Sequence, residues 1–132
     1  MEEELTTQLI YHTVMKKVLV AEDNDSNYIL MTYILKKYYQ FERARNGQEA
    51  VEMAGRGDYD IVLMDIKMPV MDGLEATKLI KESYPDLPVV ALTANAFDND
   101  RQLAFDAGCV DFLSKPVSSE ACLSTIKKYV GE

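Results

Sequence analysis

Apolar residues along the chain gather in short unbroken runs, and the stretches between them have a helical period. The runs are residues 18–21, 61–64 and 89–92. Uninterrupted runs of this length are typical of strands that are buried on both faces of a parallel sheet. Between two such strands, Tyr28, Met31, Leu35 and Tyr38 recur at steps of three and four. This spacing predicts an amphipathic helix.

The same alternation continues to the end of the chain and predicts ten elements. The expected strands are residues 17–22, 40–44, 60–64, 88–92 and 110–113, and the expected helices are residues 25–38, 47–56, 72–83, 97–107 and 117–130. Five strand–helix units predict a doubly wound α/β fold, in which five helices cover both faces of a five-stranded parallel sheet. Residues 1–16 lie outside this pattern and are expected to form an N-terminal extension or linker. The domain itself is expected to span residues 17–131.

Charge and composition narrow the classes of function. The 132 residues are enough for one domain, and 22 acidic against 14 basic residues give a net charge of −8. An acidic surface disfavours nucleic acids and anionic membranes as partners. The acidic N-terminus is unlike a secretory signal, and no apolar run approaches a membrane span. We therefore expect a cytoplasmic protein, in which Cys109 and Cys122 are buried or inert thiols.

Polar residues follow four of the five predicted strands. Glu22 and Asp23 follow the first strand, and Asp65 follows the third. Thr93 follows the fourth strand, and Lys115 lies just beyond the fifth. Ligands of parallel α/β sheets bind beyond the carboxyl ends of the strands. We therefore expect these five side chains to converge at one edge of the sheet.

These residue types together point to phosphoryl transfer. Three neighbouring carboxylates repel one another, and a hard cation such as Mg²⁺ relieves this repulsion. The set offers none of the cysteine or histidine ligands of a zinc site. A lysine and a threonine hydroxyl supply the positioning and charge neutralisation that phosphoryl transfer requires. Asp65 is the expected nucleophile, which would form an acyl phosphate.

Four motifs carry a resemblance to a known family. They are residues 18–24 (VLVAEDN), 63–73 (LMDIKMPVMDG), 91–96 (ALTANA) and 113–116 (LSKP). In this order they resemble the receiver domain of two-component response regulators, over roughly residues 16–130. The second and third motifs are most similar to those in receivers of hybrid histidine kinases. The resemblance implies a flavodoxin-like receiver fold with strand order 2-1-3-4-5.

The resemblance also implies roles for the residues at the strand ends. Asp65 would be the phospho-acceptor, and Asp23 would bind Mg²⁺ directly. Glu22 would act on the metal largely through water, and the main-chain carbonyl of Lys67 would complete the protein ligands. Mn²⁺ is expected to substitute for Mg²⁺.

The remaining implied roles concern the phosphoryl oxygens and the switch. Thr93 and Lys115 would each contact one phosphoryl oxygen, and the Lys115–Pro116 peptide is a candidate for the cis form. Phe112 would change rotamer together with Thr93. This change would alter the surface of the fourth helix, the fifth strand and the fifth helix, and hydrolysis of the acyl phosphate by the domain itself would reset it.

The expected partners are a histidine kinase or a histidine phosphotransfer protein, with a phosphorylation-dependent homodimer as a further option. We expect neither nucleic acid nor direct membrane contact. The chain could be a stand-alone relay receiver, but the motif spelling favours a receiver from a hybrid histidine kinase. Residues 1–16 would then be an inter-domain linker, and the domain would lie at the cytoplasmic face of the membrane.

Two rival functions use related chemistry or a related fold. A phosphohydrolase similar to haloacid dehalogenases would need a second acid two residues after the nucleophile, where this chain has Lys67. A flavin carrier would need a Ser/Thr-Gly-rich loop after the first strand, where this chain has Glu22 and Asp23. Asp72 is expected to act as a turn or cap residue, and Asn24 is expected to cap the first helix.

Overall fold

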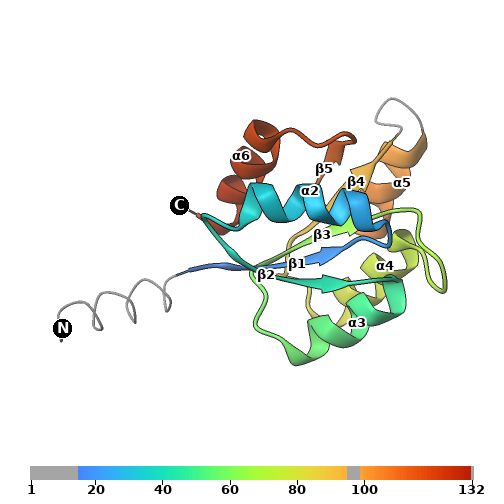
Figure 1. The fold of residues 1–132 in the computed structure, drawn as a ribbon. Coiled ribbons are helices and arrows are strands. Elements are labelled where there is room, and N and C mark those ends of the chain that lie inside the picture. Colours follow the sequence, from blue (N-terminus) through green and yellow to red (C-terminus); the bar gives the residue numbers. More distant parts are fainter. Residues whose placement is uncertain (1–14, 95–98, 132) are drawn as a thin grey trace.

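The computed structural model describes residues 15–94 and 99–131, which form five strands and five helices (Figure 1). The strands are β1 (Lys17–Ala21), β2 (Gln40–Ala44), β3 (Ile61–Asp65), β4 (Val89–Thr93) and β5 (Asp111–Ser114). The helices are α2 (Asp25–Leu35), α3 (Gly47–Arg56), α4 (Gly73–Ser83), α5 (Asn99–Ala107) and α6 (Ser119–Val130). Within these ranges, every helix is too short or too polar to cross a membrane.

The five strands form one parallel sheet in the order β2-β1-β3-β4-β5, which confirms the predicted α/β fold class and the implied strand order. The register places Ala21 beside Met64, Asp65 beside Leu92, and Thr93 beside Ser114. The carboxyl ends of four strands therefore lie level at one edge of the sheet. Residues that follow these ends are brought together although they are far apart in sequence.

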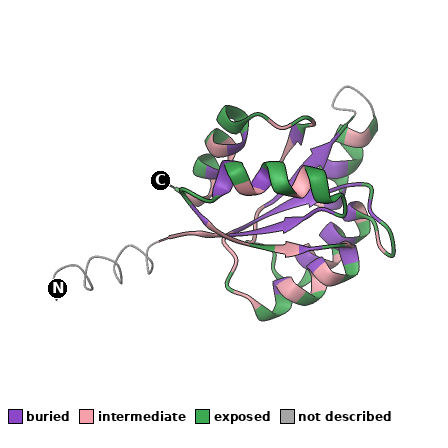
Figure 2. Ribbon diagram, in the orientation of Figure 1, coloured by how far each residue is buried: buried purple, intermediate pink, exposed green. Residues whose placement is uncertain are grey.

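The central strands β1, β3 and β4 are buried on both faces, as their unbroken apolar runs predicted (Figure 2). Val18 and Val20 of β1 pack with buried residues of α2 and α6. Leu19 and Ala21 point to the opposite face and pack with residues of α3, α4 and α5. Alternate residues of one strand thus enter two separate cores, which is why the central strands β1, β3 and β4 lack a polar face.

Several element boundaries differ from the sequence prediction. The first helix ends at Leu35 rather than at residue 38, because the chain turns there and both Tyr38 and Tyr39 donate main-chain hydrogen bonds to the Leu35 carbonyl. This turn buries Tyr39 and leaves Tyr38 exposed, although the helical pattern included Tyr38. Asp65 and Thr93 are the last residues of their strands rather than the first residues beyond them. The predicted start of the fourth helix, at residue 97, lies outside the described residues.

Both cysteines are free and buried, as expected. Burial raises the pKa of Cys109 to about 11, although a hydrogen bond with Thr77 and the charge of Lys81 act in the opposite direction. Burial also raises the pKa of Cys122 to about 11. Both thiols therefore stay protonated, and so poorly nucleophilic, at neutral pH.

Val70, in the loop between β3 and α4, has an unfavourable backbone conformation. Its φ is +69°, a left-handed value that costs a β-branched residue free energy, and its side chain is exposed. We expect Val70→Asn to raise the free energy of unfolding by about 1 kcal/mol, because asparagine tolerates this region. Urea unfolding would measure the change. Val70→Ile keeps the β-branch and should leave stability unchanged, whereas an equal gain in that variant would contradict the explanation.

Candidate functional site

The five predicted residues of the strand ends converge at the carboxyl edge of the sheet. Glu22 and Asp23 directly follow β1, Asp65 ends β3, Thr93 ends β4, and Lys115 follows β5. Carboxylate oxygens of Glu22, Asp23 and Asp65 lie within 4.8 Å of one another. Glu22, Asp65 and Thr93 are buried, whereas Asp23 is exposed. The edge therefore concentrates negative charge on two buried carboxylates and one exposed carboxylate.

Lys115 connects the two buried carboxylates. Its Nζ lies 3.0 Å from Glu22 Oε1 and 3.1 Å from Asp65 Oδ2. Burial and, to a smaller extent, the neighbouring Glu22 carboxylate together raise the pKa of Asp65 to about 7, and the Lys115 ammonium only partly offsets this rise. Burial alone would lower the pKa of Lys115, but the two carboxylates raise it above its usual value. Lys115 is therefore a stable positive charge at neutral pH, while Asp65 is poised between two protonation states.

The raised pKa of Asp65 predicts a stability gain in Asp65→Asn. The folded pKa of about 7 exceeds the unfolded value of 3.8, so ionisation of Asp65 destabilises the fold. This destabilisation grows as the pH rises from about 4 to about 7 and stays constant above pH 7. In chelator-treated buffer at pH 8, the free energy of unfolding should be about 2 kcal/mol higher for the variant than for wild type, because solvent screening at this partly open site reduces the roughly 4 kcal/mol that the full shift would give. Near pH 4 the difference should vanish. A gain that does not depend on pH, measured by urea unfolding, would contradict this cause.

An open hollow lies beside Asp65, and we call it the Asp65 hollow. It is lined by Asp65, Ile66, Lys67, Leu92, Thr93, Ala94, Asp100 and Lys115. The main-chain nitrogen of Lys67 lies 3.4 Å from Asp65 Oδ1, to which it donates. A carboxylate, a hydroxyl and an ammonium therefore face one small space. The sequence analysis did not single out Asp100, which no strand-end pattern marks.

The loop between β3 and α4 fixes the main chain of Asp65 by a close approach. The Gly73 nitrogen donates to the carbonyl oxygen of Ile66 at 2.7 Å. A Cβ at Gly73 would lie 2.1 Å from the carbonyl oxygen of Asp65. Asp72 caps α4 by accepting a hydrogen bond from the Glu75 nitrogen, as its predicted structural role requires.

The residues at this edge fit a divalent cation with oxygen ligands. The cluster of Glu22, Asp23 and Asp65 offers only carboxylate oxygens, the donor type that Mg²⁺ prefers. Glu22 Oε1 is buried, and among residues 15–94 and 99–131 its partner is the Lys115 ammonium, 3.0 Å away. Because a carboxylate oxygen has two lone pairs, this buried oxygen can also bind a cation or a water that the cation holds.

Phe112 lies near the site but does not line the Asp65 hollow. It is opposite Ala91 in the sheet, so it shares a sheet face with Thr93, which is two residues further along β4. Its ring makes an edge-to-face contact with Phe105 at 6.2 Å, and the Arg101 guanidinium lies 4.8 Å from the ring centre. Phe112 therefore connects the strand that carries Thr93 with the outer surface of α5.

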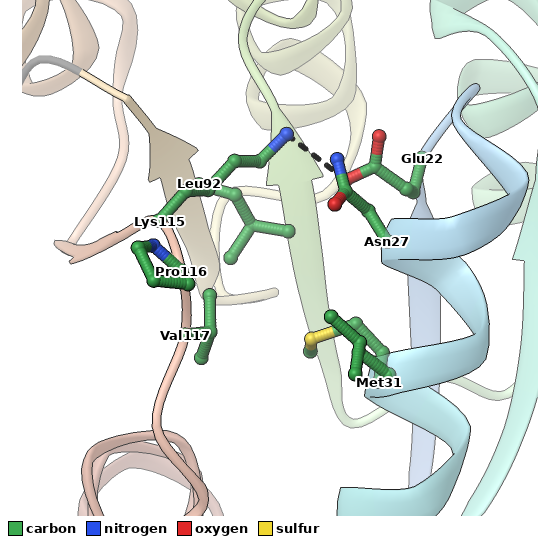
Figure 3. Close-up of a pocket in the computed structure, with 8 residues that line it drawn as sticks. Glu22, Asn27, Met31, Leu92, Lys115, Pro116 and Val117 are labelled. Atoms are coloured by element: carbon green, nitrogen blue, oxygen red, sulfur yellow. Dashed lines mark ion pairs between the residues drawn. The ribbon is translucent and has the colours of Figure 1, made fainter.

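A second pocket, which we call the α2 pocket, lies between α2 and the segment after β5 (Figure 3). It is lined by Glu22, Asn27, Leu30, Met31, Leu92, Lys115, Pro116 and Val117. Met31 and Val117 face each other across its apolar part, and the Lys115–Glu22 ion pair closes its polar end (Figure 3). The Lys115–Pro116 peptide is cis, as the family resemblance implied. Leu92 and Lys115 line both pockets, so the α2 pocket directly adjoins the Asp65 hollow.

The polar residues after Asp23 divide into caps and charge partners. Asn24 caps α2 by accepting a hydrogen bond from the Asn27 nitrogen. Asp25 pairs with Arg43 at 2.9 Å and with Arg45 at 3.5 Å. The sequence analysis missed both arginines, because their contacts depend on the register of β2 beside β1 rather than on a local pattern.

Comparison with solved structures places this geometry among receiver domains. The receiver domain of the sensor histidine kinase PA1611 from Pseudomonas aeruginosa, solved with a magnesium ion in its active-site cleft, is 33% identical with a TM-score of 0.85. The comparison covers 90% of this chain and all of that one. The receiver domain of Ssk1 from Saccharomyces cerevisiae, solved in complex with the histidine phosphotransfer protein Ypd1, is 32% identical with a TM-score of 0.83, covering 88% of this chain and 89% of that one.

Sequence comparisons give the same family. Hybrid signal transduction histidine kinase B of Dictyostelium discoideum is 39% identical over 131 residues, and the match covers 88% of this chain but only 7% of the kinase. The polar-differentiation response regulator DivK of Brucella anthropi is 38% identical over 120 residues, with 89% of this chain and 98% of DivK covered. The family model for the response regulator receiver domain matches residues 18–127. The chain therefore belongs to the response regulator receiver domains of two-component signalling systems.

Proposed function

We propose that this receiver domain takes a phosphoryl group from a phosphohistidine onto Asp65. The observation that carries the proposal is the convergence of Asp65, Thr93 and Lys115 around one hollow, with Lys115 Nζ 3.1 Å from Asp65 Oδ2. Glu22, Asp23, Asp65 and the main-chain carbonyl of Lys67 would hold Mg²⁺, or Mn²⁺ in its place. The bound cation would neutralise charge on the phosphoryl oxygens.

In the transfer step, a carboxylate oxygen of Asp65 attacks phosphorus and forms an acyl phosphate. The bond between phosphorus and the imidazole nitrogen breaks, and the electron pair leaves with the imidazole. Lys115 and the hydroxyl of Thr93 stabilise the phosphoryl oxygens through charge and hydrogen bonding. Water later attacks phosphorus, which releases inorganic phosphate and restores the Asp65 carboxylate.

The phosphoryl group would also change the relative free energies of two conformations of the domain, and so act as a switch. It would draw the Thr93 side chain towards the new oxygens, and Phe112, on the same sheet face, would then move against Phe105 and Arg101. The surface that changes is formed by α5, β5 and α6. Such a surface would carry the signal to an output partner or to a second copy of the phosphorylated domain.

The partner that delivers the phosphoryl group would be a histidine kinase or a histidine phosphotransfer protein, in the cytoplasm or at the cytoplasmic face of the membrane. The Ssk1 receiver, which is similar to this chain, was solved in complex with such a phosphotransfer protein. The 39% identity to a segment of a hybrid kinase supports an origin in a hybrid histidine kinase. The match to nearly the whole of DivK supports a stand-alone receiver as the alternative. Residues 1–16 are proposed as the linker or extension ahead of a domain over residues 17–131.

Intact-mass measurement after incubation with acetyl phosphate and Mg²⁺ tests the proposal. We expect a gain of one phosphoryl group, which chelation of the metal prevents and hydroxylamine removes, because acyl phosphates react with that nucleophile. A gain of mass that resists hydroxylamine would indicate another kind of acceptor. No gain with acetyl phosphate or with a phosphorylated histidine donor would contradict the proposal.

We further propose that the α2 pocket is the docking surface for the histidine-containing partner. Any donor must cover the Asp65 hollow, and the neighbouring face of α2 exposes Ile29, Leu30 and Tyr33. Exposed apolar groups that adjoin a polar reaction site are typical of a partner interface.

Leu30→Ser tests this docking surface. It should reduce the rate of transfer from a histidine phosphotransfer protein about fivefold, because an apolar contact is lost. The rate with acetyl phosphate, which needs no docking, should stay unchanged. Leu103→Ser on α5 is the matched control, since Leu103 is a similarly exposed leucine outside both pockets. Equal losses in the two variants would contradict docking at α2.

A further inference from the structure

Arg43 of β2 contacts the acidic turn after β1 in three ways. Its Nε donates a hydrogen bond to the main-chain carbonyl oxygen of Glu22 at 3.0 Å. Its Nη1 lies 2.9 Å from Asp25 Oδ1, and its guanidinium carbon lies 4.6 Å from the centre of the Tyr28 ring. One side chain thus connects β2, the turn that carries the acidic residues and the first turns of α2.

The strand β2 holds both main-chain groups of Glu22. The Glu22 nitrogen donates to the carbonyl oxygen of Ala44 at 3.0 Å, and the Glu22 carbonyl accepts from Arg43. The peptide that joins Glu22 to Asp23 therefore has a fixed orientation. Asp23 itself is exposed and takes its direction from this peptide.

One part of the Arg43 guanidinium makes no contribution through hydrogen bonding. The side chain is 12% exposed, and its Nη2 is buried without a hydrogen-bond partner in residues 15–94 and 99–131. A buried donor without a partner costs free energy, and an apolar side chain of similar length would avoid this cost. The guanidinium nitrogens that do have partners all bind at the acidic turn and the start of α2, which points to a task there.

We propose that Arg43 is a positioning residue for Mg²⁺ binding, because it orients the Glu22–Asp23 peptide and so the carboxylates on both sides of it. The proposal rests on the proposed function only for the assignment of Glu22 and Asp23 as metal ligands. Groups that orient metal ligands without touching the metal commonly change the affinity for the metal.

The loss of the Arg43 charge and the loss of its positioning contacts would change the Mg²⁺ affinity in opposite directions. If only charge mattered, removal of a cation near the carboxylate cluster would strengthen Mg²⁺ binding. If positioning dominates, removal would weaken it. Arg45 provides the comparison, because it also pairs with Asp25, whereas the hydrogen bond to the Glu22 carbonyl comes from Arg43.

Arg43→Met and Arg45→Met form the matched pair for the experiment. Methionine keeps an unbranched apolar stem but removes every donor and the charge. The Mg²⁺ dissociation constant would be measured by titration calorimetry at constant ionic strength, without any phosphodonor. We expect it to rise about tenfold in Arg43→Met and to stay the same or fall slightly in Arg45→Met. An unchanged or lower dissociation constant in Arg43→Met would overturn the proposal, as would an equal rise in both variants.

A kinetic measurement distinguishes a loss of Mg²⁺ affinity from a general loss of phosphorylation activity. With acetyl phosphate, Arg43→Met should need about tenfold more Mg²⁺ for half-maximal phosphorylation, while the rate at saturating Mg²⁺ stays within about twofold of wild type. A lower rate at saturation with unchanged Mg²⁺ dependence would contradict positioning. If wild type takes up no phosphoryl group, the proposed function fails, but calorimetry still decides the role of Arg43.

The folded state of the variants is checked by urea unfolding. If Arg43→Met does not unfold cooperatively, Arg43→Lys replaces it in the calorimetric test. Lysine keeps the charge, but its single ammonium cannot bond the Glu22 carbonyl, pair with Asp25 and stack on Tyr28 at once. A weaker Mg²⁺ affinity in this variant supports the proposal, because the charge is unchanged, and a wild-type affinity overturns it.

Discussion

Asp65→Asn is expected to abolish the uptake of a phosphoryl group from acetyl phosphate. The amide lacks the anionic oxygen that attacks phosphorus, and it also removes one of the three carboxylates of the cluster. Intact mass after incubation with Mg²⁺ should show only unmodified protein. The fold should remain intact, because Lys115 keeps its ion pair with Glu22.

The control for this variant is Asp72→Asn. Asp72 lies in the same loop, but its side chain accepts a hydrogen bond from the Glu75 nitrogen and caps α4. Asparagine caps helices about as well as aspartate, so this variant should take up the phosphoryl group at the wild-type rate. A mass gain that survives in Asp65→Asn and disappears in Asp72→Asn would place the acceptor at residue 72.

Gly73→Ala is expected to lower the free energy of unfolding by about 3 kcal/mol, because the new methyl group has no room. Its Cβ would lie 2.1 Å from the main-chain oxygen of Asp65 and 2.9 Å from the Cα of Ile66. These are backbone atoms that cannot rotate away. The variant should also lose most of its phosphorylation, since the strain falls on the main chain of the acceptor residue. Urea unfolding and intact mass measure the two effects.

Gly55→Ala is the matched control for this clash. Gly55 lies within α3, and a Cβ there would meet only the Tyr84 hydroxyl, at 3.3 Å, which is the end of a side chain that can move. Because alanine favours helix more than glycine does, stability should stay constant or rise by up to about 1 kcal/mol. Similar losses in both variants would show that close approach to Asp65 is not the cause.

The predictable part of the fold is the part that depends on local pattern. Unbroken apolar runs such as residues 61–64 predicted strands buried on both sides, and the predicted capping residues Asn24 and Asp72 are observed at the starts of α2 and α4. The predicted end of α2 was wrong. Tyr38 fits the helical period, but the chain has to turn after Leu35 to begin β2 at Gln40. A local pattern contains no information about where the next strand must start.

The same distinction applies to the candidate site. Glu22, Asp65, Thr93 and Lys115 could be predicted, because parallel strands place their carboxyl ends at one edge. The contacts of Arg43 with Glu22 and of Phe112 with Phe105 could not. They depend on the strand register and on how side chains of separate elements pack, and neither leaves a repeating signal in the sequence.

The direction of the strands has a practical consequence for reporter design. β1 begins, and α6 ends, at the amino edge of the sheet, opposite the edge that carries Asp65 (Figure 1). A fluorescent protein fused ahead of Lys17 or after Val130 would therefore be attached far from the Asp65 hollow. Such fusions should report where the domain resides in a cell without blocking access of a donor to it.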